Sequence, residues 1–209
     1  CATPSRAFAR SRKQPLALAA PAVNAAVQIN EARSGPLPDL TNRVVWLSMR
    51  AKIIPGGCGH EDAPEDPGGA ASFALVRGRV VAFDGASGAW VESARVFEDA
   101  DGGWERVDLL LDYAAKTYTL CLRGVAVHRD LGFADPSLTR PVRIEIRNGE
   151  GGEAALDAVT FLDGEPENMD FDGDGLSNDQ ERLLGTGIWS SDTDGDGLSD
   201  YDEVTEIGR

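Results

Sequence analysis

The chain has 209 residues and 42% of them are hydrophobic, which is enough for one ordinary folded domain with shorter segments attached. The formal net charge of −15 argues against nucleic-acid binding, because an acidic surface repels phosphate. No stretch approaches the roughly 18 consecutive apolar residues that a membrane-spanning helix needs.

The charge is distributed unevenly along the chain. Residues 1–40 contain five basic and two acidic residues, a net charge of +3, whereas residues 163–209 contain two basic and 15 acidic residues, a net charge of −13. We therefore expect three parts: an N-terminal tether or arm at residues 1–40, a folded middle part at residues 41–163, and an acidic tail at residues 164–209.

The sequence begins at Cys1. A mature bacterial lipoprotein is numbered from the Cys that carries lipid after signal-peptide cleavage, so Cys1 is a candidate lipidation site. Two alternatives stay open: a chain that starts part-way along a longer protein, and a signal sequence at residues 10–26, although Pro21 breaks its short apolar stretch. If Cys1 carries lipid, a basic arm would lie against anionic headgroups or an acidic partner, at roughly 1 kcal/mol per residue. That arm contains Arg6, Arg10, Arg12 and Lys13.

The two other cysteines are Cys58 and Cys121. They form an even pair if Cys1 is lipidated, and a disulfide between them is possible in an oxidising compartment. Two buried free thiols are the alternative, since a sequence does not give the Cα separation that would decide.

The middle of the chain predicts β-structure. In the stretch VVWLSMRAKII, apolar residues alternate with Ser48, Arg50 and Lys52, as in a half-buried strand. The stretch WERVDLLLDYAAKTYTLCLRGVAV predicts a hairpin that turns at DYAAKT, and RIEIR and ALDAVTFL predict later strands. The residues expected to face the core are Val45, Leu47, Met49, Ala51 and Ile53, then Val107, Leu109 and Leu111, then Tyr118, Leu120 and Leu122, and finally Val142, Ile144 and Ile146.

Six to nine short strands with hardly any helix indicate an all-β, antiparallel β-sandwich. The hairpin WERVDLLLDYAAKTYTLCLRGVAV resembles the central hairpin of laminin-G-like, concanavalin A-like jelly rolls, and AALDAVTF resembles their last strand. This resemblance covers residues 41–163 and implies a jelly roll. Many members of that fold bind glycans and some hydrolyse them, and the fold alone does not choose between these activities.

Catalysis is not expected. Glucan hydrolases of this fold carry a Glu-x-Asp-x-x-Glu run on one strand, whereas RIEIRNGE offers only Glu145 and Glu150. A retaining glycosidase needs two carboxyl groups about 5 Å apart, and nothing in the sequence places these two so. The two histidines, His60 and His128, have no Ser or Cys at a catalytic spacing.

The tail contains two copies of a twelve-residue acidic pattern, DFDGDGLSNDQE and DTDGDGLSDYDE, at a 22-residue period. An EF-hand-type loop binds Ca²⁺ through side-chain oxygens at positions 1, 3, 5, 9 and 12 and a backbone carbonyl at position 7, with Gly at position 6. Two Ca²⁺ ions are therefore expected, rather than a disordered acidic tail. The ligands are Asp170, Asp172, Asp174, Leu176, Asn178 and Glu181 in the first loop, and Asp192, Asp194, Asp196, Leu198, Asp200 and Glu203 in the second.

The helix that enters an EF-hand is missing before Asp170, while short helices are expected after each loop, at NDQERLL and SDYDEVTEI. The pattern over residues 170–204 resembles bacterial thrombospondin type 3 repeats, except that Gly187 and Ile188 stand where the family often has Asp-Pro. The resemblance implies an extracellular, calcium-rigidified spacer or docking element.

The main hypothesis is a non-catalytic module in the bacterial periplasm or at the cell surface. It would be anchored to the membrane through lipid at Cys1 and would dock as an extrinsic subunit on a membrane-protein complex or other surface proteins. The alternative is a lectin-like module that binds glycan through exposed aromatic residues, for which Trp46, Trp90 and Trp104 are candidates unless they belong to the core. A glycan hydrolase is the third and least favoured class.

Overall fold

A computed structural model gives the fold of the chain. It describes residues 16–18, 24–28, 40–41, 43–54, 67–76, 79–96, 104–140, 143–147 and 153–207. The strands are β1 (Leu16–Leu18), β2 (Asn24–Gln28), β3 (Val44–Ile54), β4 (Phe73–Val76), β5 (Arg79–Asp84), β6 (Ala89–Val96), β7 (Trp104–Asp112), β8 (Thr117–Leu122), β9 (Val125–Gly132), β10 (Arg143–Arg147) and β11 (Glu153–Asp163). Two helices, α2 (Asn178–Leu184) and α3 (Asp200–Ile207), lie in the tail.

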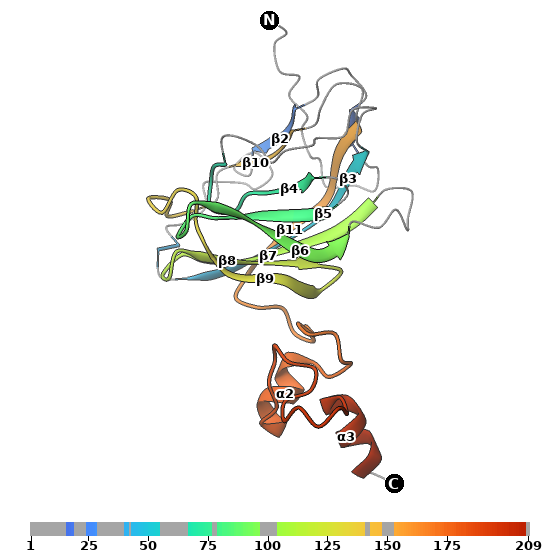
Figure 1. The fold of residues 1–209 in the computed structure, drawn as a ribbon. Coiled ribbons are helices and arrows are strands. Elements are labelled where there is room, and N and C mark those ends of the chain that lie inside the picture. Colours follow the sequence, from blue (N-terminus) through green and yellow to red (C-terminus); the bar gives the residue numbers. More distant parts are fainter. Residues whose placement is uncertain are drawn as a thin grey trace, which may run out of the picture.

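The described strands form three sheets in which every pair is antiparallel. The six-stranded sheet has the order β1-β11-β3-β7-β8-β9, the three-stranded sheet the order β4-β5-β6, and β10 pairs with β2. Figure 1 shows these strands stacked in layers, with α2 and α3 below them in that view. The expected all-β, antiparallel β-sandwich is therefore confirmed.

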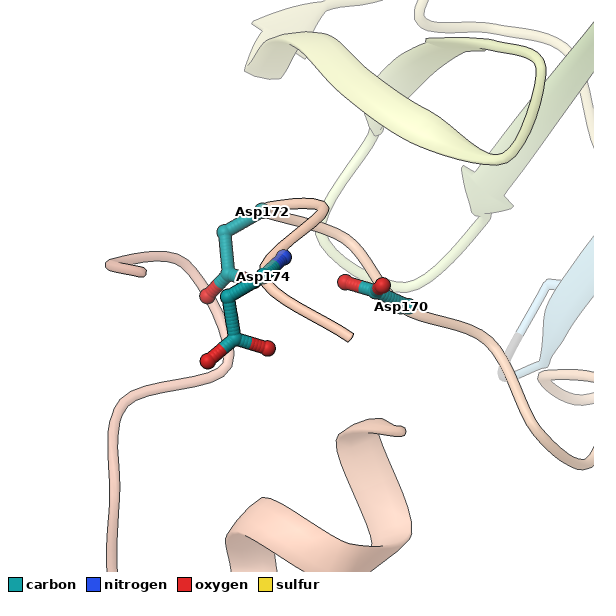
Figure 2. A group of neighbouring side chains, drawn as sticks. All are labelled: Asp170, Asp172 and Asp174. Carbon is teal, nitrogen blue, oxygen red and sulfur yellow. The ribbon is translucent and has the colours of Figure 1, made fainter. Parts of the chain in front are cut away.

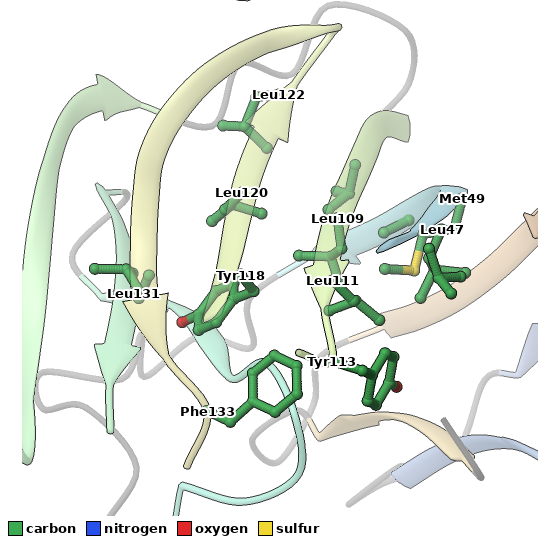
Figure 3. Packing of buried hydrophobic residues seen from close by; sticks show 14 of the residues in the cluster. Leu47, Met49, Leu109, Leu111, Tyr113, Tyr118, Leu120, Leu122, Leu131 and Phe133 are labelled. Atoms are coloured by element: carbon green, nitrogen blue, oxygen red, sulfur yellow. The ribbon is translucent and has the colours of Figure 1, made fainter. Parts of the chain in front are cut away.

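The core lies between the inner face of the six-stranded sheet and the three-stranded sheet. The alternating residues of β3, β7 and β8 point into it, as the sequence predicts (Figure 3). Tyr118 also joins the two sheets, because its hydroxyl donates to the carbonyl oxygens of Ser72 and Phe83 at 3.0 and 2.7 Å. The predicted core residues found there are Val45, Leu47, Met49, Ala51, Val107, Leu109, Leu111, Tyr118, Leu120 and Leu122.

The β7–β8 hairpin turns where the sequence predicts. The carboxylate of Asp112 accepts the backbone N–H groups of Ala114 and Ala115, both at 2.8 Å. Lys116 closes the turn with a φ of 61°. Its ammonium group donates to the carbonyl oxygen of Leu138 at 2.8 Å, which ties the turn to the loop after β9.

The predicted boundary between the N-terminal arm and the sandwich, at residue 40, is too far along the chain, because strands of the sheets begin before it. β1 pairs with β11, β2 pairs with β10, and Leu40 is a buried core residue. The stretches LAL and NAAVQ are too short to show a clear alternation, and their partner strands lie far along the chain, so no local pattern predicts them. No helix among the described residues is long and apolar enough to cross a bilayer.

The predicted tail helices are confirmed. α2 is the stretch NDQERLL, and its first turn is fixed by a capping box between Ser177 and Gln180. Gly185 ends the helix with a φ of 85°, a conformation that glycine adopts without steric cost. α3 follows the second loop as expected.

Leu120→Ala should lower the free energy of unfolding by about 2–5 kcal/mol, because Leu120 is fully buried and its truncation leaves a cavity. Leu183→Ala is the matched control. Leu183 is 87% exposed, so its loss should cost less than about 0.5 kcal/mol. Urea denaturation in saturating calcium measures the change in the free energy of unfolding for both variants. Equal changes would contradict the assignment of the core.

Candidate metal centre

Each acidic loop folds around the aspartate at its first position. The two carboxylate oxygens of Asp170 accept the backbone N–H groups of Gly173 and Gly175, at 2.6 and 3.1 Å. Asp192 repeats the arrangement with Gly195 and Gly197, at 2.7 and 3.0 Å. The two loops therefore share one backbone geometry, which the repeated sequence pattern predicts.

The glycine at position 6 is needed for this geometry. Gly175 has a φ of 112° and Gly197 a φ of 100°, conformations that residues with a Cβ rarely adopt. At Gly175 the space is also restricted, since a Cβ there would lie 3.1 Å from the ring of Tyr201.

The aspartates at positions 3 and 5 each accept one backbone N–H of their own loop. In the first loop, Asp172 accepts the N–H of Asp174 at 3.2 Å, and Asp174 accepts the N–H of Leu176 at 2.7 Å. In the second loop, the corresponding distances from Asp194 to Asp196 and from Asp196 to Leu198 are 3.1 and 2.9 Å.

In each loop, one oxygen from each of the three aspartates lies within 4.8 Å of those of the other two. Figure 2 shows the first set, with Asp172 and Asp174 next to each other and Asp170 across the loop from them. Three carboxylates this close repel one another unless a cation lies between them. Hard oxygen donors of this kind are the ligands that Ca²⁺ prefers.

Glu181, at position 12 of the first loop, is fully buried, and neither of its carboxylate oxygens has a hydrogen-bond partner in the structure. Burial, together with the negative charges of Asp172 and Asp174, raises the pKa of Glu181 to about 7. Asp172 is similar: its Oδ2 is buried without a partner, and burial raises its pKa to about 6. A buried, unpaired carboxylate is costly, and a bound cation would remove that cost.

The predicted ligands at position 9, Asn178 and Asp200, hold the backbone of their own loops in the structure. Asn178 and Asp200 are fully buried, and each accepts the backbone N–H of the residue at position 2, Phe171 or Thr193, at 3.0 Å. The amide of Asn178 also donates to Glu165 at 2.5 Å. The side chain at position 9 thus bonds to the backbone near the start of its own loop.

The two loops differ in their surroundings. The three aspartates of the first loop are all half-buried, and Leu176 at position 7 is buried. In the second loop Asp194 and Asp196 are exposed, and Leu198 at position 7 is 43% exposed. Glu203 at position 12 is half-buried, and its pKa is raised by burial and by the charge of Asp194. The first site is therefore the more enclosed one.

The loops also contact each other. The backbone N–H of Tyr201, in the first turn of α3, donates to Oδ2 of Asp174 at 2.9 Å. The second repeat therefore fixes a carboxylate of the first. The sequence gives no indication of this contact, because each loop matches the ligand pattern on its own.

The other predicted sites are the disulfide, the lipidation site and the aromatic platform for glycan. Cys121 is a buried, free cysteine, and burial raises the pKa of its thiol. Cys1 and Cys58 lie outside the described residues.

Trp46 is fully buried, so it is not an exposed aromatic platform for glycan. Trp90 and Trp104 are half-buried, against Phe83 and Arg50 respectively.

Two of the residues considered for catalysis, Glu145 and His128, lie on strands of the sandwich. Glu145 lies on β10, where its backbone is opposite Ala26 of β2. His128 is half-buried on β9, and burial lowers its pKa. His60 and Glu150 lie outside the described residues.

The most important residue that the sequence analysis did not single out is Phe171, at position 2 of the first loop. It is fully buried and stacks between Trp46 and Trp189. The sequence did offer one indication: an aromatic residue stands between two aspartates of the acidic pattern, where the second loop has Thr193.

Comparison with known proteins supports the calcium loops. A family model described as the bacterial TSP3 repeat matches residues 170–186 and 192–208. The TSP3 match and the two aspartate clusters together identify the tail as a calcium-binding module attached to an antiparallel β-sandwich.

A search of curated proteins finds no match. Among solved structures, the chain is similar to the binding domain of Paraclostridial Mosquitocidal Protein 1, with 14% identity and a TM-score of 0.40 over 68% of this chain and 38% of that chain. It is also similar to an alginate lyase from Pseudomonas aeruginosa, with 12% identity and a TM-score of 0.37 over 68% of this chain and 83% of that chain. The chain thus spans 38% of the first of these two structures.

In protein stripped of calcium, raising the pH from about 5 to about 8 should destabilise the tail. The folded-state pKa values of Glu181 and Asp172, about 7 and about 6, lie above their ordinary values of 4.5 and 3.8. In their protonated form these two groups stabilise the folded tail. That stabilisation is present below their ordinary pKa values and is lost as the pH rises through their folded-state pKa values.

With calcium the pH dependence should reverse. The tail should become more stable as the pH rises, because the ion binds the deprotonated carboxylates. The measurement is the rate at which a protease cleaves the tail across this pH range, with and without the ion. A calcium-free tail that becomes more resistant as the pH rises would contradict the expectation.

Proposed function

We propose that the tail binds two Ca²⁺ ions, one in each loop, and that the ions hold it in the shape seen here. The observation that carries this proposal is the buried, unpaired carboxylate of Glu181 beside the three aspartates of its loop. The side chains of Asp170, Asp172, Asp174 and Glu181 would bind the first ion, and those of Asp192, Asp194, Asp196 and Glu203 the second. The carbonyl groups of Leu176 and Leu198 would complete the sets, while Asn178 and Asp200 would support the loops or act through water.

Calcium suits these loops better than magnesium does. Each loop offers six positions whose oxygens are flexible in distance, and the glutamate at position 12 can bind through both of its oxygens. Mg²⁺ demands a nearly ideal octahedron and keeps several waters, which a loop of this kind does not favour.

The consequence of binding is mechanical. The ligand positions of the two loops gather nine carboxylates, counting Asp200, over a segment with few apolar residues to oppose their repulsion. Two ions bring four positive charges, so binding and folding of the tail are coupled. We infer a non-catalytic, calcium-stabilised interaction module that acts outside the cytoplasm, where modules of this kind bind calcium at about 10⁻⁴–10⁻³ M.

The partner we propose is a membrane-protein complex or another surface protein, on which the chain docks as an extrinsic subunit tethered by lipid at Cys1. The basic arm after Cys1 and the strongly acidic tail give the chain two ends of opposite charge for such contacts. Of the seven large hydrophobic side chains that are exposed among the described residues, five lie in the tail. They are Leu183, Leu184, Leu198, Tyr201 and Val204.

A glycan-binding role is the alternative that the sequence raised. One of its three candidate aromatic residues, Trp46, is buried under the tail and is not available to a sugar. Nothing in the geometry of Trp90 or Trp104 favours this alternative, so the interaction module remains our conclusion.

Calorimetry should give two Ca²⁺ ions per chain, and Glu181→Gln should weaken one site while leaving the other intact, because it removes one charged ligand from the first loop. Glu167→Gln is the matched control, since Glu167 is an exposed glutamate of the same tail outside both loops. Chelation should make residues 165–209 sensitive to protease while the sandwich stays protected. A stoichiometry near zero, or a tail that remains protected in excess chelator, would refute the calcium module.

The mass of the protein purified from its native membrane should show lipid on Cys1, and Cys1→Ser should release the protein from that membrane. Cys121→Ser is the control, because Cys121 is buried in the fold and takes no part in anchoring. Pull-down of the native protein should recover a membrane-protein complex. An unmodified amine at Cys1 in membrane-derived protein would exclude the anchor.

A further inference from the structure

Four side chains form a continuous stack between the sandwich and the first calcium loop. Trp46 of β3 stacks on Phe171 with ring centroids 6.2 Å apart and planes 22° apart. Phe171 stacks on Trp189, from the segment between the two repeats, at 4.4 Å and 11°. The guanidinium of Arg129, on β9, lies 5.6 Å from the Trp189 ring.

The backbone on both sides of Phe171 is fixed as well. Its carbonyl oxygen accepts the N–H of Ala126 on β9 at 2.8 Å, and its N–H donates to Asn178 at 3.0 Å. Met169, two residues earlier, is buried in the same cluster as Trp46. Gly173, two residues later, lies against the side chain of Val125, which would be 3.1 Å from a Cβ at that position.

This contact acts directly on the metal centre, because Phe171 stands between Asp170 and Asp172. Neighbouring Cα atoms are about 3.8 Å apart, so a displacement of Phe171 displaces the carboxylates on both of its sides. The second loop is an internal comparison: it has Thr193 at this position, and two of its three clustered aspartates are exposed.

We propose that the outer face of the six-stranded sheet is part of the first calcium site, with Trp46 as its positioning residue. The stack holds Phe171 so that Asp170 and Asp172 lie at metal-binding distance before the ion arrives. Calcium at the first loop and attachment of the tail to the sandwich are then one coupled equilibrium, and each favours the other by the same factor. This inference rests on the proposed calcium binding of the tail.

Coupling of this kind gives the two sites different roles. The first ion fixes the junction between the tail and the sandwich, because its loop contacts the sheet through Phe171. The second ion stiffens the segment beyond it. Loss of calcium from the first loop would free the tail to change its direction relative to the sandwich. For a docking element, that direction determines which partners it can contact.

The test is a calcium titration of Trp46→Leu by calorimetry, in the full chain. Stacked aromatic pairs contribute enough that removing the Trp46 ring should weaken one of the two sites by about 10-fold and leave the other unchanged. Trp104→Leu is the matched control: Trp104 lies on the same sheet against Arg50, away from the tail, so both sites should keep their affinities. Trp46→Leu protein with a folded sandwich and both affinities unchanged would overturn the proposal.

A second measurement uses the unaltered chain and so does not depend on how well a variant folds. Hydrogen exchange at the amide of Ala126, which donates to Phe171, should slow when calcium is added, because the ion strengthens attachment of the loop to β9. Exchange at the Leu120 amide, in the sandwich core, should change less. Two bound ions with no change at Ala126 would refute the coupling while leaving the calcium module intact, whereas no bound ion would refute both.

Discussion

Electrostatic repulsion among the carboxylates of the tail is the constraint on which the rest of the structure depends. Each loop brings three aspartate oxygens within 4.8 Å of one another, and the first loop adds a glutamate that is fully buried. Hydrogen bonds from the loop backbone hold individual carboxylate oxygens in place but do not neutralise them. A divalent cation does, and for that reason the shape of the tail and the presence of the ion are linked.

The two parts of the chain are therefore stabilised by different forces. The sandwich is held by burial of alternating apolar side chains between two sheets, with Tyr118 bonding across them. The tail buries little of this kind, and several of its apolar side chains remain exposed. Conditions that change charge, such as pH or chelation, act mainly on the tail, while changes in core packing act on the sandwich.

Phe171 is where these two kinds of stabilisation meet. Its ring belongs to a hydrophobic cluster with Trp46 on the sheet, while its neighbours along the chain are aspartates of the first cluster. Packing on one side of the residue and ion binding on the other act on the same short piece of backbone. In the coupling that we propose, the β-sandwich sets the geometry of a calcium loop whose sequence pattern is complete without it.

The sequence by itself determined what is local: the strand alternation of β3, β7 and β8, the hairpin turn at Asp112, the glycines and aspartates of both loops, and the helices that follow them. Each of these depends on residues within about twelve positions of one another, so periodicity and spacing are enough. Only the tertiary structure decided that β1 and β2 belong to the sheets, that Trp46 is buried and not exposed, that Glu181 has no hydrogen-bond partner, and that Tyr201 bonds to Asp174. Burial of a side chain depends on which distant segments cover it, and a local pattern carries no information about them.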